Sequence, residues 1–276
     1  MTVILDGTGV SKKIRTQLKR KASKLNVKPC LAAVIIGEDH ASKMYVSMKE
    51  KACFEAGFKS KVIRLGGKTS EYTLLKKINS LNCDKSVHGI LVQLPLPKHI
   101  DADSVFQSID PSKDVDGFTP VSMGKLMAGD ESMVAATPKG VMMLLDEYRI
   151  KYEGKEVVLV NHSTVVGKPL AMLFLNRLAT VTVCHVKTKD LKSHTRRADI
   201  LVSATGVPHL IKADMVKKGA VVVDVGVAKK DGKTVGDVDF EKVKNKCSYI
   251  SPVPGGAGPM TIAALLQNTL LAAKGK

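Results

Sequence analysis

The chain has 276 residues, 44% of them hydrophobic and 25% charged, which are the proportions of a globular protein with one large domain or two modest ones. Its net charge of +17 favours anionic ligands such as phosphorylated cofactors or polycarboxylates. Dispersed lysines and an aromatic content of only 4% argue against a nucleic-acid interface. No apolar run approaches the roughly 18 residues of a membrane span. The five cysteines are scattered, which argues against a disulfide framework.

Helix and strand patterns alternate through the first half of the chain. Periodicity and capping residues predict helices at Val10–Leu25, Ala41–Ala56, Thr69–Leu81 and Asp101–Ile109. Short apolar runs predict strands at Cys30–Ile36, Lys61–Leu65 and Val87–Leu94, and Pro111–Pro120 is predicted to be a polar loop.

The alternation continues in the second half. Thr137 and Pro138 are predicted as the N-cap and first position of a helix over Lys139–Tyr148. The remaining predicted strands are Glu156–Val160, Thr180–Cys184, Asp199–Ala204 and Ala220–Val225, and the remaining helices are Pro169–Leu178 and Met260–Ala273. This order predicts an α/β fold with a mostly parallel sheet, which binds ligands at the carboxyl ends of its strands.

Tyr45 and Lys49 are spaced i,i+4, which places the phenol and the ammonium on one helix face. A lysine whose pKa is lowered by burial can carry protons near neutral pH, although a solvated lysine beside a half-buried tyrosine is the alternative. Short-chain dehydrogenases carry the same YxxxK pair, but a glycine-rich nucleotide turn precedes it there and none precedes it here. That assignment is therefore rejected.

Three further polar side chains fall at predicted strand ends or loops. Gln93 ends an apolar strand, where its amide can face a ligand or accept a hydrogen bond from a lysine. Asp114 and Asp116 lie in a loop, where aspartates most often cap turns; they could also bind a polar heterocycle, but offer too few ligands for a metal. The seven histidines and five cysteines show no metal-ligand spacing, so we predict no metal site.

Two segments have the features of ligand-binding turns. Val160–Pro169 joins a strand to a helix and holds Gly167, so the free N–H groups of the helix are predicted to face a cofactor phosphate. The next strand ends in Cys184–Thr188 without the acidic residue of an NAD-type site, which favours a 2′-phosphate. Ser251–Thr261 is a Pro/Gly-rich turn that opens the last helix, and it is predicted either to approach a ligand or to form a tight turn.

These segments, in this order, resemble one family. The matching motifs are SxxYVxxKxK (residues 42–51), GILVQLPLP (89–97), KDVDGF (113–118), ATPxG (136–140), VVGKP (165–169), VGDV (235–238) and PVPGGxGPMT (252–261). Together they span nearly the whole chain. The chain is identified by them as similar to the bifunctional methylenetetrahydrofolate dehydrogenase/methenyltetrahydrofolate cyclohydrolases.

The resemblance implies two α/β domains. Residues 1–137, completed by a C-terminal helix at 260–276, would form the folate-binding catalytic domain, and residues 138–259 a Rossmann-like NAD(P)-binding domain. It implies oxidation of 5,10-methylenetetrahydrofolate to the methenyl form, then hydrolysis to 10-formyltetrahydrofolate for purine biosynthesis. The family is typically cytosolic and homodimeric, and Met1–Val10 shows no secretory signal. The alternative is a dehydrogenase with little cyclohydrolase activity.

The resemblance also implies residue roles. Lys49 is expected to be the catalytic lysine, Gln93 its hydrogen-bond partner, Tyr45 to pack on the folate, and Asp116 to bind the amino edge of the pterin. Substrate contacts are expected from Pro254, Gly258 and Thr261. Cofactor contacts are expected from Asn161, His162, Ser163, Val186 and Val227.

The cofactor turn departs from the family pattern. The common Gly-Arg-Ser is Asn161-His162-Ser163 here, and a later serine is Val186. In NADP-dependent members that arginine and serine hold the 2′-phosphate, so His162, Lys187 and Lys189 would have to replace them. We expect NADP, with NAD as the alternative, since no acidic residue ends the second strand. Expected partners are tetrahydrofolate derivatives, whose anionic polyglutamylated forms would suit the +17 charge, with no nucleic acid or membrane.

Overall fold

The computed structural model describes residues 1–275, which divide into two compact units. One unit combines Met1–Lys12 with Thr137–Thr261, and the other combines Lys13–Ala136 with the residues from Ile262 onward. Helices α1 (Gly7–Ala22) and α10 (Ala257–Lys274) each begin in the first unit and end in the second. Over these 275 residues, no helix has the length and apolar composition needed to cross a bilayer.

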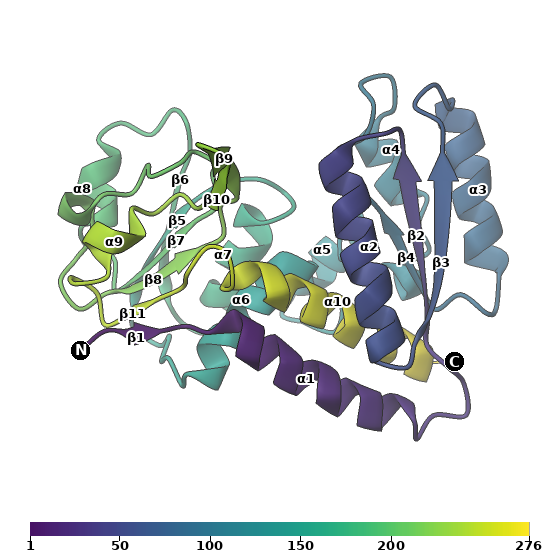
Figure 1. Ribbon diagram of the computed structural model, residues 1–276, viewed down its shortest axis with the longest axis horizontal. Coiled ribbons are helices and arrows are strands. Elements are labelled where there is room, and N and C mark those ends of the chain that lie inside the picture. The colour runs from purple at the N-terminus through teal and green to yellow at the C-terminus, as the bar shows by residue number, and fades with distance from the viewer. Residues whose placement is uncertain (276) are drawn as a thin grey trace. The chain divides into compact units, whose positions relative to one another are not determined.

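The second unit, here the three-stranded unit, has a parallel sheet in the order β3-β2-β4 (Figure 1). Its strands are β2 (Cys30–Ile36), β3 (Lys59–Leu65) and β4 (Gly89–Val92), and its helices include α2 (His40–Glu55), α3 (Glu71–Cys83), α4 (Ala102–Gln107) and α5 (Pro120–Met127). The chain leaves β2 toward β3 and returns to β4 on its other side. The carboxyl ends of β2 and β4 therefore form a switch point of the kind where open α/β sheets bind ligands.

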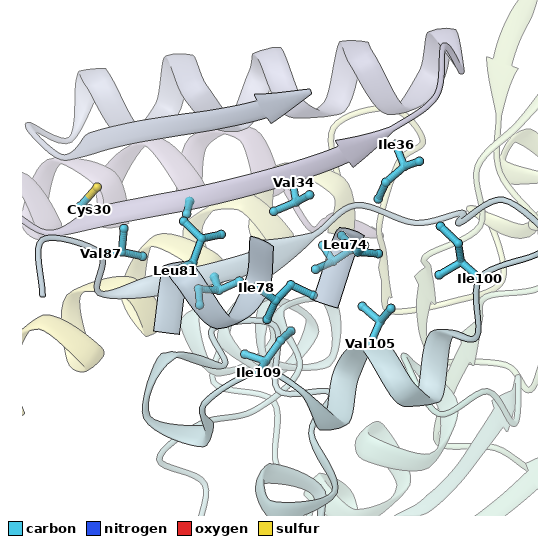
Figure 2. Packing of buried hydrophobic residues seen from close by; sticks show 13 residues of the cluster. Cys30, Val34, Ile36, Leu74, Ile78, Leu81, Val87, Ile100, Val105 and Ile109 are labelled. Atoms are coloured by element: carbon cyan, nitrogen blue, oxygen red, sulfur yellow. The ribbon is translucent and has the colours of Figure 1, made fainter. Parts of the chain in front are cut away.

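Strand β2 forms the centre of this unit and is buried at all seven of its residues. Alternate β2 side chains, including Cys30, Val34 and Ile36, pack with Leu74 and Ile78 of α3 (Figure 2). The β2 side chains that point the other way are also buried, because α2 packs on β2 and β3. Burial on both faces explains why β2 is a continuous apolar run in the sequence.

The first unit, here the six-stranded unit, has a sheet in the order β1-β11-β8-β7-β5-β6 with every pair parallel. Its strands are β1 (Val3–Ile4), β5 (Glu156–Val160), β6 (Thr180–Cys184), β7 (Ile200–Ser203), β8 (Val221–Asp224) and β11 (Tyr249–Ile250). Its helices are α6 (Ala136–Glu147), α7 (Gly167–Leu175), α8 (Leu191–Thr195) and α9 (Phe240–Val243). A separate antiparallel hairpin is formed by β9 (Ala228–Lys230) and β10 (Lys233–Val235). Because β5 lies between β6 and β7, its carboxyl end is a second switch point.

The predicted α/β fold with mostly parallel sheets is confirmed, and the differences concern short or terminal elements. Val3–Ile4 pairs with β11 in the six-stranded unit, rather than belonging to the unit that contains residues 13–136. A strand of two residues is too short to show the alternation of apolar and polar residues that predicts a strand. Thr137 and Pro138 lie inside α6 rather than at its cap, so that prediction is wrong. Helix α5 was not predicted; it begins inside the segment that the sequence indicated as a loop.

Candidate functional site

Helix α2 positions the predicted catalytic lysine. The helix begins after Asp39, whose side chain accepts a hydrogen bond from the N–H of Ser42 at 2.7 Å, as an N-cap does. Val46 and Cys53 are buried on its inner face. Tyr45 and Lys49 are half-buried at the border of that face, so both reach from the interior toward solvent.

The ammonium of Lys49 is held by Gln93. Gln93 directly follows β4 and continues it, because its N–H donates to the carbonyl of Val34 at 2.8 Å. Its side-chain Oε1 accepts from Lys49 Nζ at 2.9 Å, and its Nε2 donates to the carbonyl of Leu94 at 2.7 Å. The second bond orients the amide oxygen toward the lysine, so the switch-point end of β4 fixes the position of Nζ.

The loop that carries Asp116 runs beside β4 and completes this group. Asp114 forms a parallel bridge to Ile90, and its carboxylate accepts from the N–H groups of Phe118 and Thr119 at 3.1 and 2.8 Å. Asp114 therefore caps the turn, as aspartates in loops most often do. Asp116 is half-buried. The structure thus brings Lys49, Gln93 and Asp116 together, with Tyr45 one helical turn before Lys49.

Burial shifts the two charged groups of this site in opposite directions. Burial lowers the pKa of Lys49, opposed by the charge of Asp116. Burial raises the pKa of Asp116 to about 6, opposed by Lys49. Both shifts favour the neutral form. Because its pKa is lowered, Lys49 reaches the neutral form, which can accept a proton, more readily than an ordinary solvated lysine does.

Two side chains that the sequence did not assign support the Asp116 loop. Lys113 is 2% exposed, and its ammonium donates to the carbonyls of Leu81, Asn82 and Asp84 at 2.9, 2.6 and 2.9 Å, at the carboxyl end of α3. Asn268 of α10 donates from Nδ2 at 2.8 Å to the carbonyls of Val115 and Val134. These two carbonyls lie before and after α5 in the chain. A lysine beside two aspartates has the pattern of a surface loop, so the sequence held no signal for this burial.

In the six-stranded unit, the predicted cofactor turn follows β5. The side-chain amide of Asn161 donates to the carbonyl of Ala204, beyond β7, at 2.6 Å, and so bridges the switch point. Its Oδ1 accepts from the N–H of Ser163, the hydroxyl of Ser163 and the N–H of Gly167 at 2.8, 2.7 and 3.0 Å. Asn161 and Ser163 thus fix the turn, while His162 between them is exposed.

The prediction that the free N–H groups of α7 face a phosphate is wrong. The N–H of Gly167 donates to Asn161, and the N–H of Lys168 donates to the carbonyl of Ser163 at 2.9 Å. The third position is Pro169, which has no N–H. The first turn of α7 is therefore satisfied internally, and a bound anion would need side chains instead.

The other predicted cofactor residues lie at the same edge of the sheet. Val186 follows β6 and is 90% exposed, and Val227 follows β8 and is 51% exposed. Since β5, β6, β7 and β8 are neighbouring parallel strands, their carboxyl ends and these residues share one edge. An exposed apolar side chain here can cover a flat ring of a nucleotide.

A buried pair of aspartates at this edge was also missed. Asp237 Oδ2 accepts from the hydroxyl of Ser203 and the N–H of Thr205 at 2.7 and 2.6 Å. The carboxylate of Asp224 accepts from the N–H groups of Gly226, Asp237 and Val238, and burial raises its pKa to about 7. The pair orders the loops after β7 and β8. Within residues 1–275, no group of three or more His, Cys, Asp or Glu is placed to hold a metal ion.

The predicted substrate residues Pro254, Gly258 and Thr261 lie on the Pro/Gly-rich turn and the first turns of α10. Pro254 and Gly258 are exposed, and a Cβ at Gly258 would meet nothing within 4 Å. The hydroxyl of Thr261 donates to the hydroxyl of Thr137 at 3.1 Å. These residues belong to the six-stranded unit, whereas Lys49, Gln93 and Asp116 belong to the three-stranded unit.

We expect Gly167→Ala to disrupt the cofactor turn. A Cβ at this position would lie 2.3 Å from the backbone oxygen of Asn161, which cannot move aside without shifting the turn. The expected loss in the free energy of unfolding is about 2 kcal/mol, measured by denaturant titration. Gly124→Ala in α5 is the matched control, because a Cβ there meets nothing within 4 Å; equal stability of the two variants would contradict the prediction.

Both halves of the chain match models of one protein family. Residues 5–116 match the tetrahydrofolate dehydrogenase/cyclohydrolase catalytic domain. Residues 135–276 match the tetrahydrofolate dehydrogenase/cyclohydrolase NAD(P)-binding domain. The two models cover the segments that carry Lys49, Gln93 and Asp116 and those that carry the cofactor turn.

Similar proteins match over their full length. The bifunctional protein FolD of Campylobacter concisus is 56% identical over 99% of this chain and 98% of its own. The FolD crystal structure from Campylobacter jejuni has a TM-score of 0.98 and 51% identity, and covers 100% of this chain and 99% of its own. The Trypanosoma brucei FolD structure, complexed with NADP and an inhibitor, has a TM-score of 0.95 and 36% identity, with 99% and 97% covered. The chain therefore belongs to the tetrahydrofolate dehydrogenase/cyclohydrolase family.

Proposed function

We propose that the protein oxidises 5,10-methylenetetrahydrofolate to the methenyl form and then hydrolyses that cation to 10-formyltetrahydrofolate. The observation that carries this proposal is the Lys49 ammonium, held at 2.9 Å by Gln93 and with its pKa lowered by burial. Family membership and the matching NAD(P)-binding domain support the dehydrogenase step. The protein is thus an oxidoreductase and a hydrolase of one-carbon metabolism.

Lys49 serves both steps through its neutral form. Loss of hydride leaves a cation on the folate, and a neutral amine beside it avoids the repulsion that an ammonium would cause. In the hydrolysis, water adds to the methenyl carbon and Lys49 accepts its proton. Lys49 returns that proton to N5, and the hydroxyl of the adduct loses its own proton to solvent as the bond from carbon to N5 breaks, which leaves the formyl group on N10. Gln93 keeps Nζ in place through this exchange.

The cofactor of the oxidation is NADP, which accepts the hydride when bound. We propose that Asn161, His162, Ser163, Val186 and Val227 hold it. The chemistry of this edge fits a dinucleotide: a parallel sheet, a switch point after β5, and no acidic residue at the end of β6. Because the N–H groups of Gly167 and Lys168 have partners within the chain, we assign the phosphate contacts to side chains.

We propose that Asp116 binds the amino edge of the pterin, that Tyr45 packs on the folate, and that Pro254, Gly258 and Thr261 contact the substrate. In this proposal residues 1–137 with 260–276 form the folate domain and residues 138–259 the cofactor domain. Strand β1 is the exception, since it pairs with the sheet of the cofactor domain.

The role of Asp116 predicts a pH dependence for folate binding. Burial raises the pKa of this carboxyl to about 6, so the carboxylate is present above that pH and is lost below it. Only the ionised form pairs with the N–H donors of the pterin as a charged acceptor. The KM for 5,10-methylenetetrahydrofolate should therefore rise by up to about tenfold per unit as the pH falls below 6. Asp116→Asn should raise KM at all pH values and flatten the profile; an unchanged profile would contradict the assignment.

We propose a homodimer in the cytoplasm that acts on polyglutamylated folates and supplies purine biosynthesis. The edge strand β6 and the neighbouring α7 expose apolar side chains, with Val183 39% and Leu175 45% exposed, which favours burial against a second copy. The +17 charge suits a polyanionic tail. Light scattering after size exclusion tests the dimer. The charge argument is tested by measuring the affinity for polyglutamylated folate at several salt concentrations, and an affinity that does not change with salt would contradict it.

A coupled assay tests the function against its alternative, a dehydrogenase without cyclohydrolase activity. Purified protein is mixed with 5,10-methylenetetrahydrofolate and NADP or NAD, and reduced nicotinamide and the methenyl intermediate are followed separately. Nicotinamide reduction without methenyl accumulation supports the bifunctional enzyme. Reduction with accumulation supports the alternative, and no reduction with either cofactor contradicts both.

A further inference from the structure

A cavity of about 410 Å³ lies at the edge of the six-stranded sheet where its strands begin. Its walls are the residues at the starts of β5, β7, β8 and β11, together with residues that follow α6. The proposed cofactor residues follow the carboxyl ends of β5, β6 and β8, which lie at the opposite edge of this parallel sheet. The cavity is therefore separate from the proposed cofactor site, and its volume is in the range of small-molecule sites.

The charged side chains that line the cavity are almost all basic. Five basic residues and one acidic residue contribute to the lining: Arg149, Lys151, Lys155, Lys217, Lys218 and Asp199. Residues 146–156 also contain four acidic residues that do not line the cavity: Asp146, Glu147, Glu153 and Glu156. Over the part of the chain that the structure describes, an anion in the cavity thus meets one carboxylate, that of Asp199.

The carboxylate of Asp199 is already neutralised by lysines of the cavity. Its Oδ1 accepts from Lys217 Nζ at 2.7 Å. This hydrogen bond is the main cause that lowers the pKa of Asp199, and the charge of Lys155 lowers it further. Among residues 1–275, the side chains of Arg149, Lys151 and Lys218 make no ion pair and no hydrogen bond. These three cations are exposed and available to a ligand.

The segments that carry the available cations have a fixed backbone. Arg149 follows α6 in the left-handed conformation, with φ at 56°, and its N–H donates to a carbonyl of α6 at 2.9 Å. Glycine adopts this position at a helix end without steric cost, so the helix end itself does not require an arginine. Beside Lys218, the N–H of Gly219 donates to the carbonyl of Lys246 at 2.8 Å, and the carbonyl of Gly219 accepts from the hydroxyl of Ser248 at 2.7 Å.

We propose that this cavity binds an anion with two or more linked phosphate groups, either an inorganic chain or the phosphate chain of a nucleotide. The cations come from two segments, residues 149–155 and 217–218, so a chain of charged groups can contact more of them than one phosphate can. Lysines are point charges, and the tetrahedral oxygens of phosphate accept from several sides, whereas a carboxylate presents two oxygens in one plane. The site goes beyond the proposed function and does not depend on it.

Calorimetric titration of the full chain with tripolyphosphate, in the presence of saturating NADP, tests this inference. NADP occupies the proposed cofactor edge, so the heat reports a phosphate site elsewhere. We expect tripolyphosphate to bind at least about tenfold more tightly than inorganic phosphate or citrate, and its affinity to fall as salt is added. Uridine 5′-triphosphate is titrated in parallel to separate the two sources of the chain. Tighter binding than tripolyphosphate assigns the site to a nucleotide, and weaker binding assigns it to an inorganic chain.

Two variants locate the binding in the cavity. Arg149→Gly should weaken tripolyphosphate about fivefold, the effect of one partly exposed ion pair, and should fold because glycine suits the left-handed conformation. Lys218→Ala should have a similar effect, and the double variant should bind about 25-fold more weakly. Lys242→Ala is the matched control, because Lys242 is exposed, pairs with Asp239 at 3.0 Å and does not line the cavity. All of these variants should keep the affinity for NADP.

The inference would be overturned if tripolyphosphate did not bind in the presence of NADP, or bound equally well to the double variant and the unmodified protein. Equal affinity for citrate, inorganic phosphate and tripolyphosphate would also overturn it, because the cations would then attract anions of any kind. Failure of the proposed function is distinguishable, since oxidation of 5,10-methylenetetrahydrofolate is measured in a separate assay. Tripolyphosphate binding that Arg149→Gly weakens would support the cavity whether or not that oxidation occurs.

Discussion

Lys49→Met should reduce the cyclohydrolase rate by at least about a thousandfold, the upper part of the range for loss of a general acid–base group. Methionine fills the half-buried space of the lysine stem but has no atom that accepts or returns the proton of the attacking water. The hydride transfer itself moves no proton through Lys49, so the dehydrogenase rate should fall much less. Methenyl-folate should therefore accumulate in an assay that follows reduced nicotinamide and the methenyl species together.

Lys51→Met is the matched control for this prediction. Lys51 lies two residues along α2 and is exposed, so its loss removes the same charge without touching Gln93. It should leave both rates unchanged. Equal cyclohydrolase rates in Lys49→Met and the unmodified protein would contradict the catalytic assignment, and a matching loss in Lys51→Met would show that net charge, rather than proton transfer, is responsible.

Most of the three-stranded unit could be predicted because its signals are local. Strand β2 is an unbroken apolar run, and α2 has Tyr45 and Lys49 at helical spacing between buried positions. The approach of Lys49 to Gln93 could be stated only through the family resemblance, since 44 residues separate them in the chain. Spacing along a helix gives the face of a residue, but not which strand end it meets.

The six-stranded unit shows where local patterns fail. Motif position predicted the turn after β5, but not that Asn161 Oδ1 takes the N–H of Gly167 and so closes the helix end to an anion. Asp224 and Asp237 are 13 residues apart, so the sequence did not indicate that they pair. The neighbouring glycines Gly226 and Gly236 were the one local signal of a close approach. A Cβ at either glycine would lie about 2 Å from the carboxylate of Asp237 or Asp224. Close approach of side chain to backbone is a property of the folded chain.

Lys113→Met should destabilise the protein by about 3 kcal/mol and loosen the loop that carries Asp116. The Lys113 ammonium is buried and bonds the carbonyls of Leu81, Asn82 and Asp84, and hydrogen bonds to a charged group contribute about 1.5–3 kcal/mol each. Some of these carbonyls are partly exposed and would regain water, so the loss should be smaller than three full bonds. Denaturant titration measures the change in unfolding free energy.

The same substitution should raise the KM for folate more than it lowers kcat, because Asp116 is the residue proposed to bind the substrate and Lys49 and Gln93 remain in place. Amide hydrogen exchange at Val115 and Gly117 should become faster than in the unmodified protein, which a loss of global stability alone would not confine to this loop. Lys85→Met, one residue past the carbonyl of Asp84 and exposed, is the control and should change neither quantity. If Lys113→Met left the exchange of these amides and KM unchanged, the buried ammonium would stabilise only the end of α3, and Asn268 alone would hold the loop.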